Sequence, residues 1–149
     1  MKKNIFNLLI CLFTVLTIQA QKFDFQSDHQ SIVVKDVNIS AAFYGEILGL
    51  KETPHPDNPP TIRWFVVNGK SHVHLIQKDF VPFEKNKSMH LCLSTPDLDA
   101  VLVHLNEHNI TYWDWPGKKN AVTTRTDGVQ QIYIQDPDNY WIEINNAKH

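Results

Sequence analysis

The chain has 149 residues, of which 42% are hydrophobic and 20% charged, and its formal net charge is −2. This length suits one ordinary domain with a hydrophobic core of its own. The near-neutral charge, without a basic run or patch, argues against a nucleic-acid-binding protein.

The first twenty residues are predicted to be a secretory signal peptide. Lys2 and Lys3 form a basic start, an apolar run spans Ile5 to Ile18, and Ala20 is the small residue before the cleavage site. The run is shorter than the roughly 20 residues that cross a bilayer, and no second apolar segment is long enough to do so. We therefore expect an exported protein, periplasmic or secreted, that is cleaved near Ala20/Gln21, forms a single domain over residues 21–149 and has no membrane contact after cleavage.

The first half of this domain shows strand and helix signals in turn. A β-rich run, His29 to Val34, precedes a helix that we expect from a cap at Asn38 to Leu48, with Gly49 after its end. Two further strands, Ile62–Val67 and Lys70–Gln77, flank Asn68-Gly69, which is the strongest short signal for a β-hairpin.

The second half repeats this layout. The strand His90–Ser94 is followed by a helix from about Asp97, whose apolar residues recur at helical spacing: Leu98, Val101, Leu102 and Leu105. Three more strands are predicted at Thr111–Trp113, Val129–Ile134 and Tyr140–Asn145, with Asn139 in a left-handed turn before the last one.

Four of these strands place a metal-capable side chain opposite their apolar stripe, because successive side chains of a strand alternate between faces. In the last strand Ile142 and Ile144 form the apolar face, and Glu143 lies on the other. In the three other strands, the same alternation places these side chains on the face opposite the apolar residues: His29 in the first, His72 and His74 in the second, and His90 and Cys92 in the third.

Two sequence motifs resemble those of vicinal oxygen chelate proteins, the glyoxalase, bleomycin resistance protein and extradiol dioxygenase superfamily. One runs from Asp28-His29 through Phe43-Tyr-Gly-Glu-Ile-Leu-Gly-Leu50, and the other is Asp136-Pro-Asp-Asn-Tyr-Trp-Ile-Glu143. The resemblance implies an α+β fold in which two βαβββ modules, residues 28–80 and 88–146, form a half-open barrel around a metal site, with the helices outside.

The resemblance also implies a set of metal ligands, since the ligands of this superfamily lie on the first and last strand of each module. Those positions hold His29, His74, His90 and Glu143. Three imidazoles and one carboxylate suit one divalent transition metal, namely Zn, Fe(II), Ni, Co or Mn, better than Ca or Mg. His72 competes with His74, and His72-Val-His74 is similar to the HxH of cupins, but no glutamate follows at the cupin position.

Other residues are candidates for contact with a substrate. Arg63, Tyr133 and Arg125, with Gln131, are predicted to hold an anionic or oxygen-rich small molecule, and four tryptophans are candidates for an aromatic pocket: Trp64, Trp113, Trp115 and Trp141. Glu143 is the predicted catalytic residue, which accepts a proton from the bound substrate.

The function that the resemblance favours is a metal-dependent, glyoxalase-like lyase or isomerase acting on a small substrate chelated through vicinal oxygens. His74 stands where glyoxalase-like members commonly have glutamate, which places plain glyoxalase I activity in doubt. The alternatives are an Fe(II) or Mn(II) extradiol-type dioxygenase and a non-catalytic ligand-binding or resistance protein. The partners implied are a small molecule and, since modules of this superfamily can pair between chains, a second copy of this chain.

Overall fold

The computed structural model describes residues 26–79 and 85–148, so the predicted signal peptide lies outside the described residues. The first module contains β1 (His29–Val34), α1 (Val37–Ala42), η1 (Phe43–Ile47), β2 (Lys51–Thr53), β3 (Ile62–Val67) and β4 (Ser71–Gln77). The second contains β5 (His90–Ser94), α2 (Leu98–Glu107), β6 (Thr123–Thr124), β7 (Gln130–Gln135) and β8 (Trp141–Asn145). No helix within these described ranges is long and apolar enough to cross a membrane.

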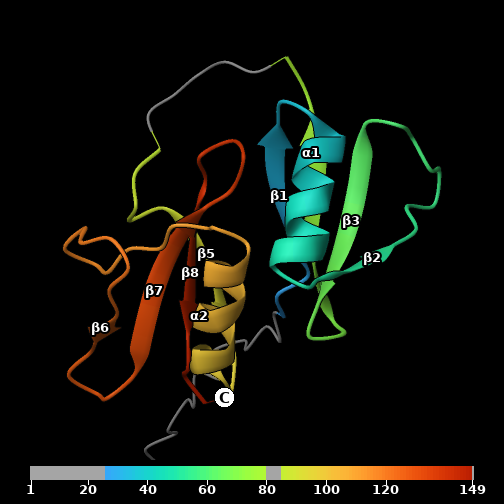
Figure 1. The fold of residues 1–149 in the computed structure, drawn as a ribbon. Helices are drawn as coiled ribbons and strands as arrows, with labels where there is room; N and C mark the ends of the chain where they lie inside the picture. The colour runs from blue at the N-terminus through green and yellow to red at the C-terminus, as the bar shows by residue number, and fades with distance from the viewer. Residues whose placement is uncertain (1–25, 80–84, 149) are drawn as a thin grey trace, which may run out of the picture.

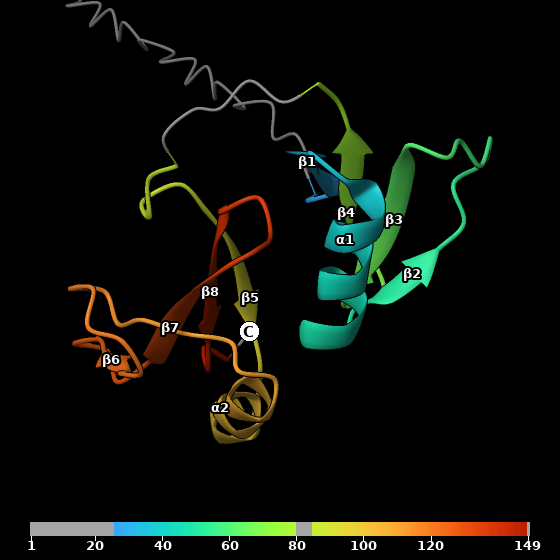
Figure 2. The ribbon, with the colours of Figure 1, turned by 45° about the horizontal axis from the view of Figure 1, so that its top comes forward.

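The two modules have the same sheet topology. Their strand orders are β1-β4-β3-β2 and β5-β8-β7-β6. β1 runs parallel to β4 and β5 runs parallel to β8, while the other neighbouring strands are antiparallel. One helix lies against one face of each sheet (Figure 1), and the view in Figure 2 shows the two sheets side by side without closing into a barrel. The predicted α+β fold with two repeated modules in a half-open arrangement is confirmed.

Local chemistry explains where the first helix begins and ends. Asp36, not the predicted Asn38, is the N-cap, and its carboxylate accepts hydrogen bonds from the backbone N–H groups of Asn38 and Ile39. The last turn widens into the π-helical η1, and the chain then leaves the helix through Gly49, whose φ of +65° suits glycine.

The predicted turns adopt the expected backbone conformations. Asn68 and Gly69 both have positive φ, 49° and 76°, and they are the central residues of a turn in which the Lys70 N–H donates to the Val67 carbonyl oxygen. Three residues separate the paired ends of β3 and β4, Val67 and Ser71, so β4 begins one residue later than predicted. Asn139 has a φ of 63° in the turn before β8, as predicted.

Three element predictions differ from the structure. The short strand β2 was not predicted, because three residues after a helix give too brief a pattern to recognise. Thr111–Trp113 is not a strand: Trp113 forms only isolated bridges, to Lys119 and Tyr133, and the fourth strand of the second sheet is β6.

The core lies between each sheet and its helix and is continuous across the two modules. Ile32 and Val34 of β1 are buried at 4% and 0% exposure, and Ile142 and Ile144 of β8 at 0% and 5%. This burial fixes the orientation of every strand, so His29, His74, His90 and Glu143 belong to the faces turned away from the helices, which we call the inner faces.

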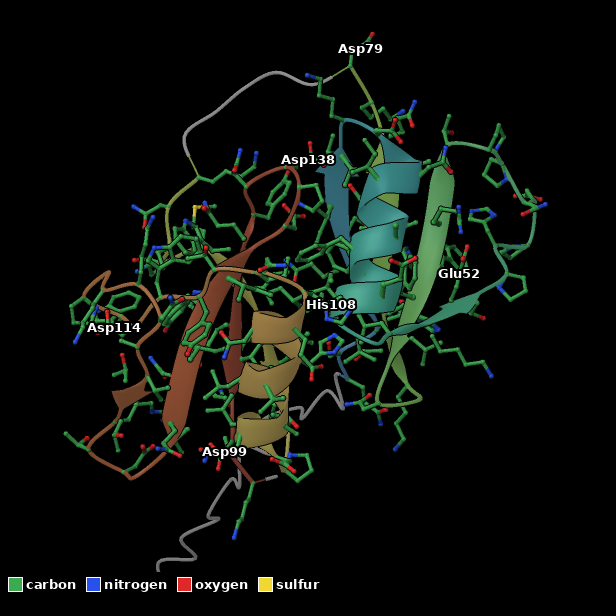
Figure 3. All side chains as sticks on the ribbon, in the orientation of Figure 1. Glu52, Asp79, Asp99, His108, Asp114 and Asp138 are labelled. Atoms are coloured by element: carbon green, nitrogen blue, oxygen red, sulfur yellow. The ribbon has the colours of Figure 1, made fainter. Side chains whose placement is uncertain are left out.

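Buried carboxylates in the turn between β7 and β8 join the modules. Asp138 accepts hydrogen bonds from the Ser40 hydroxyl (3.1 Å) and the Lys35 backbone N–H (3.1 Å), and it lies beside the start of α1 (Figure 3). Asp136 accepts one from the Tyr44 hydroxyl (3.1 Å). These hydrogen bonds satisfy buried acceptors from the second module with donors from the first, which fixes how the modules are placed.

Candidate metal centre

The register of the second sheet arranges its inner-face side chains in rows. Cys92 is opposite Glu143, and Glu143 is opposite Tyr133. The neighbouring rows pair His90 with Trp141 and Gln131 with Asn145. Because side chains in one row are direct neighbours across the strands, these groups form one polar and aromatic surface around Glu143.

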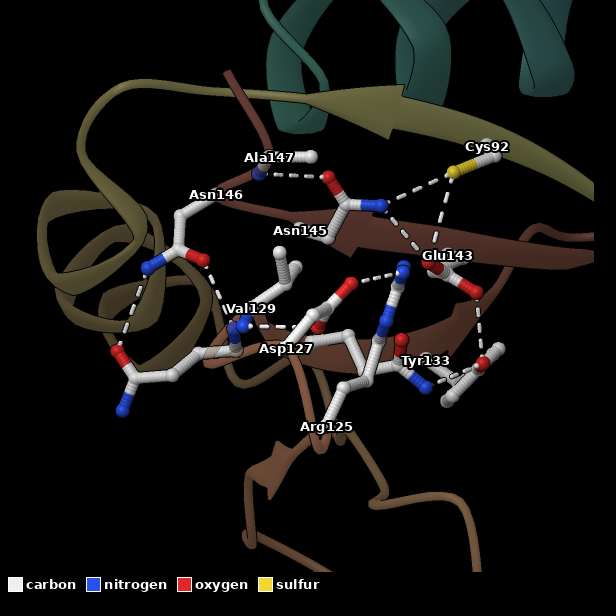
Figure 4. A network of polar contacts seen from close by, with 11 residues as sticks. Cys92, Arg125, Asp127, Val129, Tyr133, Glu143, Asn145, Asn146 and Ala147 are labelled. Atoms are coloured by element: carbon white, nitrogen blue, oxygen red, sulfur yellow. Dashed lines mark hydrogen bonds and ion pairs between the residues drawn. The ribbon is translucent and has the colours of Figure 1, made fainter.

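Three donors hold the Glu143 carboxylate in place (Figure 4). The Tyr133 hydroxyl donates to Oε2 (2.6 Å), while Asn145 Nδ2 (2.8 Å) and the Cys92 thiol (3.5 Å) donate to Oε1. Burial alone would raise the pKa of Glu143, but these hydrogen bonds outweigh it and hold the pKa below the ordinary glutamate value. Glu143 is therefore a carboxylate held in one position, and its side chain is 8% exposed.

His90 directs its Nε2 atom at this carboxylate. Its Nδ1 lies 2.7 Å from the backbone carbonyl oxygen of Lys87, which can only accept, so Nδ1 bears the hydrogen. In a neutral imidazole Nε2 then has a lone pair, and Nε2 is 3.2 Å from Glu143 Oε2. Two facing lone pairs repel, so this geometry needs a cation at the pair, either a proton on Nε2 or a metal ion.

The inner face of the first sheet holds the other two predicted ligands. The rings of His29 and His74 are stacked with their centroids 4.2 Å apart, and Trp64 stacks on His74 at the same separation. His29 Nδ1 is 2.6 Å from Asp28 Oδ2, a carboxylate–imidazole contact that leaves Nε2 available as a ligand. Burial, with the neighbouring His29 and His72, lowers the pKa of His74 and so favours the neutral ring that a metal needs.

The two sheets place these residues at equivalent positions. His29 is opposite His72 in β4, just as His90 is opposite Trp141 in β8. His74 follows two residues after His72, and Glu143 two residues after Trp141. By this pseudo-symmetry His74, not His72, is the counterpart of Glu143, which supports the predicted ligand set.

One chain does not gather all of these ligands. Among residues 26–79 and 85–148, no group of three or more His, Cys, Asp or Glu side chains is close enough to hold one ion. The predicted ligands form two half-sites instead, His29 with His74 and His90 with Glu143. The donor chemistry of both fits a divalent transition metal, because neutral imidazoles and a carboxylate are the ligands such metals prefer.

The structure places Arg63 apart from the other two predicted substrate-binding residues, Tyr133 and Arg125. Arg63 lies on the helix side of its sheet, where it forms an ion pair with Glu52, so it does not share a face with His74. Tyr133 is on the inner face, but its hydroxyl is engaged with Glu143. Arg125 forms an ion pair with Asp127 beside the Glu143 network (Figure 4).

Sequence reasoning missed the groups that orient the ligands. The Lys87 carbonyl oxygen fixes the His90 tautomer, and Asp28 contacts His29. A backbone carbonyl has no sequence signal, whereas Asp28 is adjacent to His29 in the chain and the pair was visible as a motif.

Comparisons with known proteins identify the family. The model of the Glyoxalase/Bleomycin resistance protein/Dioxygenase superfamily matches residues 26–144. The uncharacterized protein YwbC of Bacillus subtilis (strain 168) is 31% identical over 124 residues, which cover 78% of this chain and 94% of YwbC.

Solved structures of other proteins are similar to this chain in fold. The Virulence protein STM3117 of Salmonella typhimurium is 25% identical, with a TM-score of 0.64, over 85% of this chain and 100% of that one. The structure of Oxidase ChaP-H2 is 20% identical, with a TM-score of 0.70, over 85% of this chain and 97% of that one, a likeness of fold alone. The chain belongs to the glyoxalase/bleomycin resistance protein/dioxygenase superfamily.

Proposed function

We propose that this protein is an exported, metal-dependent, glyoxalase-like lyase or isomerase that acts on a small substrate bound through two vicinal oxygens. The observation that best supports the metal is the 3.2 Å contact between His90 Nε2 and Glu143 Oε2, because in the neutral ring both atoms present lone pairs to the position that a metal ion would take. Proteins of this superfamily typically use a divalent metal, which agrees with these donors.

The complete site is proposed to form between two copies of the chain. Each chain has both half-sites, but they do not meet within its described residues. In a two-fold dimer, His29 and His74 of one chain face His90 and Glu143 of the other, so two equivalent sites result. The inner face of the first sheet would then also be covered, where Val33 is 39% exposed.

The four side chains set the charge of the site. Three neutral imidazoles and one carboxylate leave a bound divalent metal with a net charge of about +1, which stabilises an enolate or a deprotonated diol held through two oxygens. Glu143 supplies the negative charge and is held rigidly by Tyr133 and Asn145. Its lowered pKa supports the role of ligand more than the predicted role of proton acceptor.

One observation favours a second candidate, the Fe(II) or Mn(II) dioxygenase. Among the described strand residues of the two inner faces, Glu143 is the one carboxylate. An isomerase needs a base for the substrate proton, whereas activation of oxygen at a metal does not need a second carboxylate. The metal that co-purifies under anaerobic conditions distinguishes the two: iron or manganese indicates the oxygenase, and zinc, nickel or cobalt the lyase or isomerase.

Binding of a chelating probe tests the proposal directly. Acetohydroxamate presents two adjacent oxygens, and calorimetric titration should show tight binding to the metal-loaded protein and none to the chelator-stripped protein. Equal binding to both forms would mean that the metal has no open coordination position, and a non-catalytic ligand-binding protein would replace the enzyme.

Export is tested by the mass of the protein recovered outside the cytoplasm. The basic start, the apolar run and Ala20 predict that protein recovered outside the cytoplasm begins at Gln21. Intact mass should show the loss of residues 1–20, and full-length protein retained in the cytoplasm would contradict export.

A further inference from the structure

The C-terminal end of α2 carries two histidines on one face of the helix. His104 and His108 are four residues apart, the spacing at which side chains of a helix are neighbours, and their ring centroids are 4.1 Å apart. Figure 3 labels His108 at the end of α2 nearest to α1. Because the inner faces are those turned away from the helices, this pair is separate from the candidate metal centre.

Backbone carbonyl groups determine which ring nitrogen of each histidine bears the hydrogen. His104 Nε2 lies 3.2 Å from the carbonyl oxygen of Glu46, and His108 Nδ1 lies 2.9 Å from the carbonyl oxygen of His104. A carbonyl oxygen can only accept, so both of these nitrogens donate. In the neutral rings, His104 Nδ1 and His108 Nε2 then have lone pairs, which gives each ring one nitrogen able to bind a metal.

These hydrogen bonds are also the support that metal-binding histidines usually have. A ligand imidazole commonly donates its other N–H to a carbonyl or carboxylate oxygen, which fixes the orientation of the ring and raises its basicity. Both members of the pair meet this condition, as His90 does with the carbonyl oxygen of Lys87. The two rings are therefore held in place before an ion binds, which lowers the entropy that binding would cost.

The ends of two helices make this place favourable for a cation. The carbonyl oxygens of Glu46 and His104 belong to the last turns of η1 and α2, and the C-terminal end of a helix carries partial negative charge. His104 and Glu46 also line a groove of about 940 Å³ between the modules, and His108 is exposed. An ion can therefore reach both rings from the solvent.

We propose that His104 and His108 bind a second divalent transition metal, independently of the centre that contains His90 and Glu143. Imidazole pairs suit zinc, nickel or copper, whereas calcium and magnesium prefer oxygen ligands. No third His, Cys, Asp or Glu within residues 26–79 and 85–148 is close enough to join the pair, so water or an external ligand completes the coordination. Because the pair is assembled only in the folded helix, the bound ion stabilises the end of α2 and its contact with Glu46.

The experiment titrates Zn(II) and Ni(II), by calorimetry, into tag-free protein in which His74→Ala and His90→Ala disable both inner half-sites. We expect one bound ion per chain and a higher Tm with the ion than without it. Adding His104→Ala or His108→Ala should weaken binding at least about 10-fold, the smallest loss that removal of a supporting group alone produces. His55→Ala, at a histidine of the first module, should change nothing.

A control of spacing keeps the number of histidines in α2 unchanged. Asn106→His combined with His108→Ala places the two histidines at i and i+2, where helical side chains do not face each other. This variant should bind no more tightly than His108→Ala alone. Circular dichroism checks the fold, and the exposure of His108 makes its replacement the safer test if His104→Ala destabilises the helix.

Three outcomes would overturn the proposal. The first is a background variant that binds neither ion, whatever the state of the inner centre. The second is an ion that survives both His104→Ala and His108→Ala with unchanged affinity. The third is binding by the i and i+2 variant that is as tight as binding by the natural pair, which would mean that the helical spacing is irrelevant.

Discussion

Replacing Glu143 by glutamine is expected to weaken metal binding by at least about 100-fold, because it removes the one negative ligand of the site, and loss of a supporting group alone costs 10- to 100-fold. Glutamine keeps the shape of the side chain, its amide oxygen can still accept from Asn145, and its NH2 group can donate to the Tyr133 hydroxyl oxygen, so the domain should remain folded. His90→Ala should have an effect of the same size. Competition with a chelating indicator measures the affinity, and circular dichroism checks the fold.

The matched control for this experiment is the pair of histidines in β4. His74→Ala should also strip the metal, whereas His72→Ala should leave the affinity near that of the wild type. The reason is the register, which makes His74 the counterpart of Glu143 and His72 the counterpart of Trp141. Metal loss in His72→Ala with retention in His74→Ala would show that the ligand of β4 is two residues earlier than proposed.

Co-expression of two metal-free variants is expected to restore metal binding. A chain with His74→Ala has an intact second half-site, and a chain with Glu143→Gln has an intact first one. In a dimer of these two chains, one of the two shared sites combines both intact half-sites. With random pairing, about half of the dimers are mixed, so the metal content should return to about a quarter of the wild-type value.

A second co-expression is the control. His29→Ala with His74→Ala damages the same half-site in both chains, so no pairing rebuilds a site and the metal content should stay near zero. Equal restoration in both experiments, or none in either, would contradict a site shared between two copies. Both mixtures must first be shown to contain dimers, by sedimentation.

The sequence alone determined the local architecture and the composition of each half-site. Helix starts, hairpins and strand faces depend on contacts within a few residues, and the period-2 pattern of β8 already placed Glu143 and Asn145 together opposite Ile142. The strand bounds of β1 and β5 were predicted to the residue. The family motifs added the two-module plan.

Which of these groups meet depends on the packing of strands and modules that are far apart in the chain. Period 2 does not separate His72 from His74, because both lie on one face, and the register against β1 distinguishes them. In β3 both faces are largely apolar, so the alternation pattern does not predict the orientation of Arg63. Pairing with β2 places this side chain beside Glu52, on the helix side. The distance between the half-sites likewise depends on how the modules pack, through Tyr44 and Asp136, which are 92 residues apart in the chain. Such long-range contacts leave no periodic signal in the sequence, so the separation of the predicted ligands into two pairs could be found only in the folded chain.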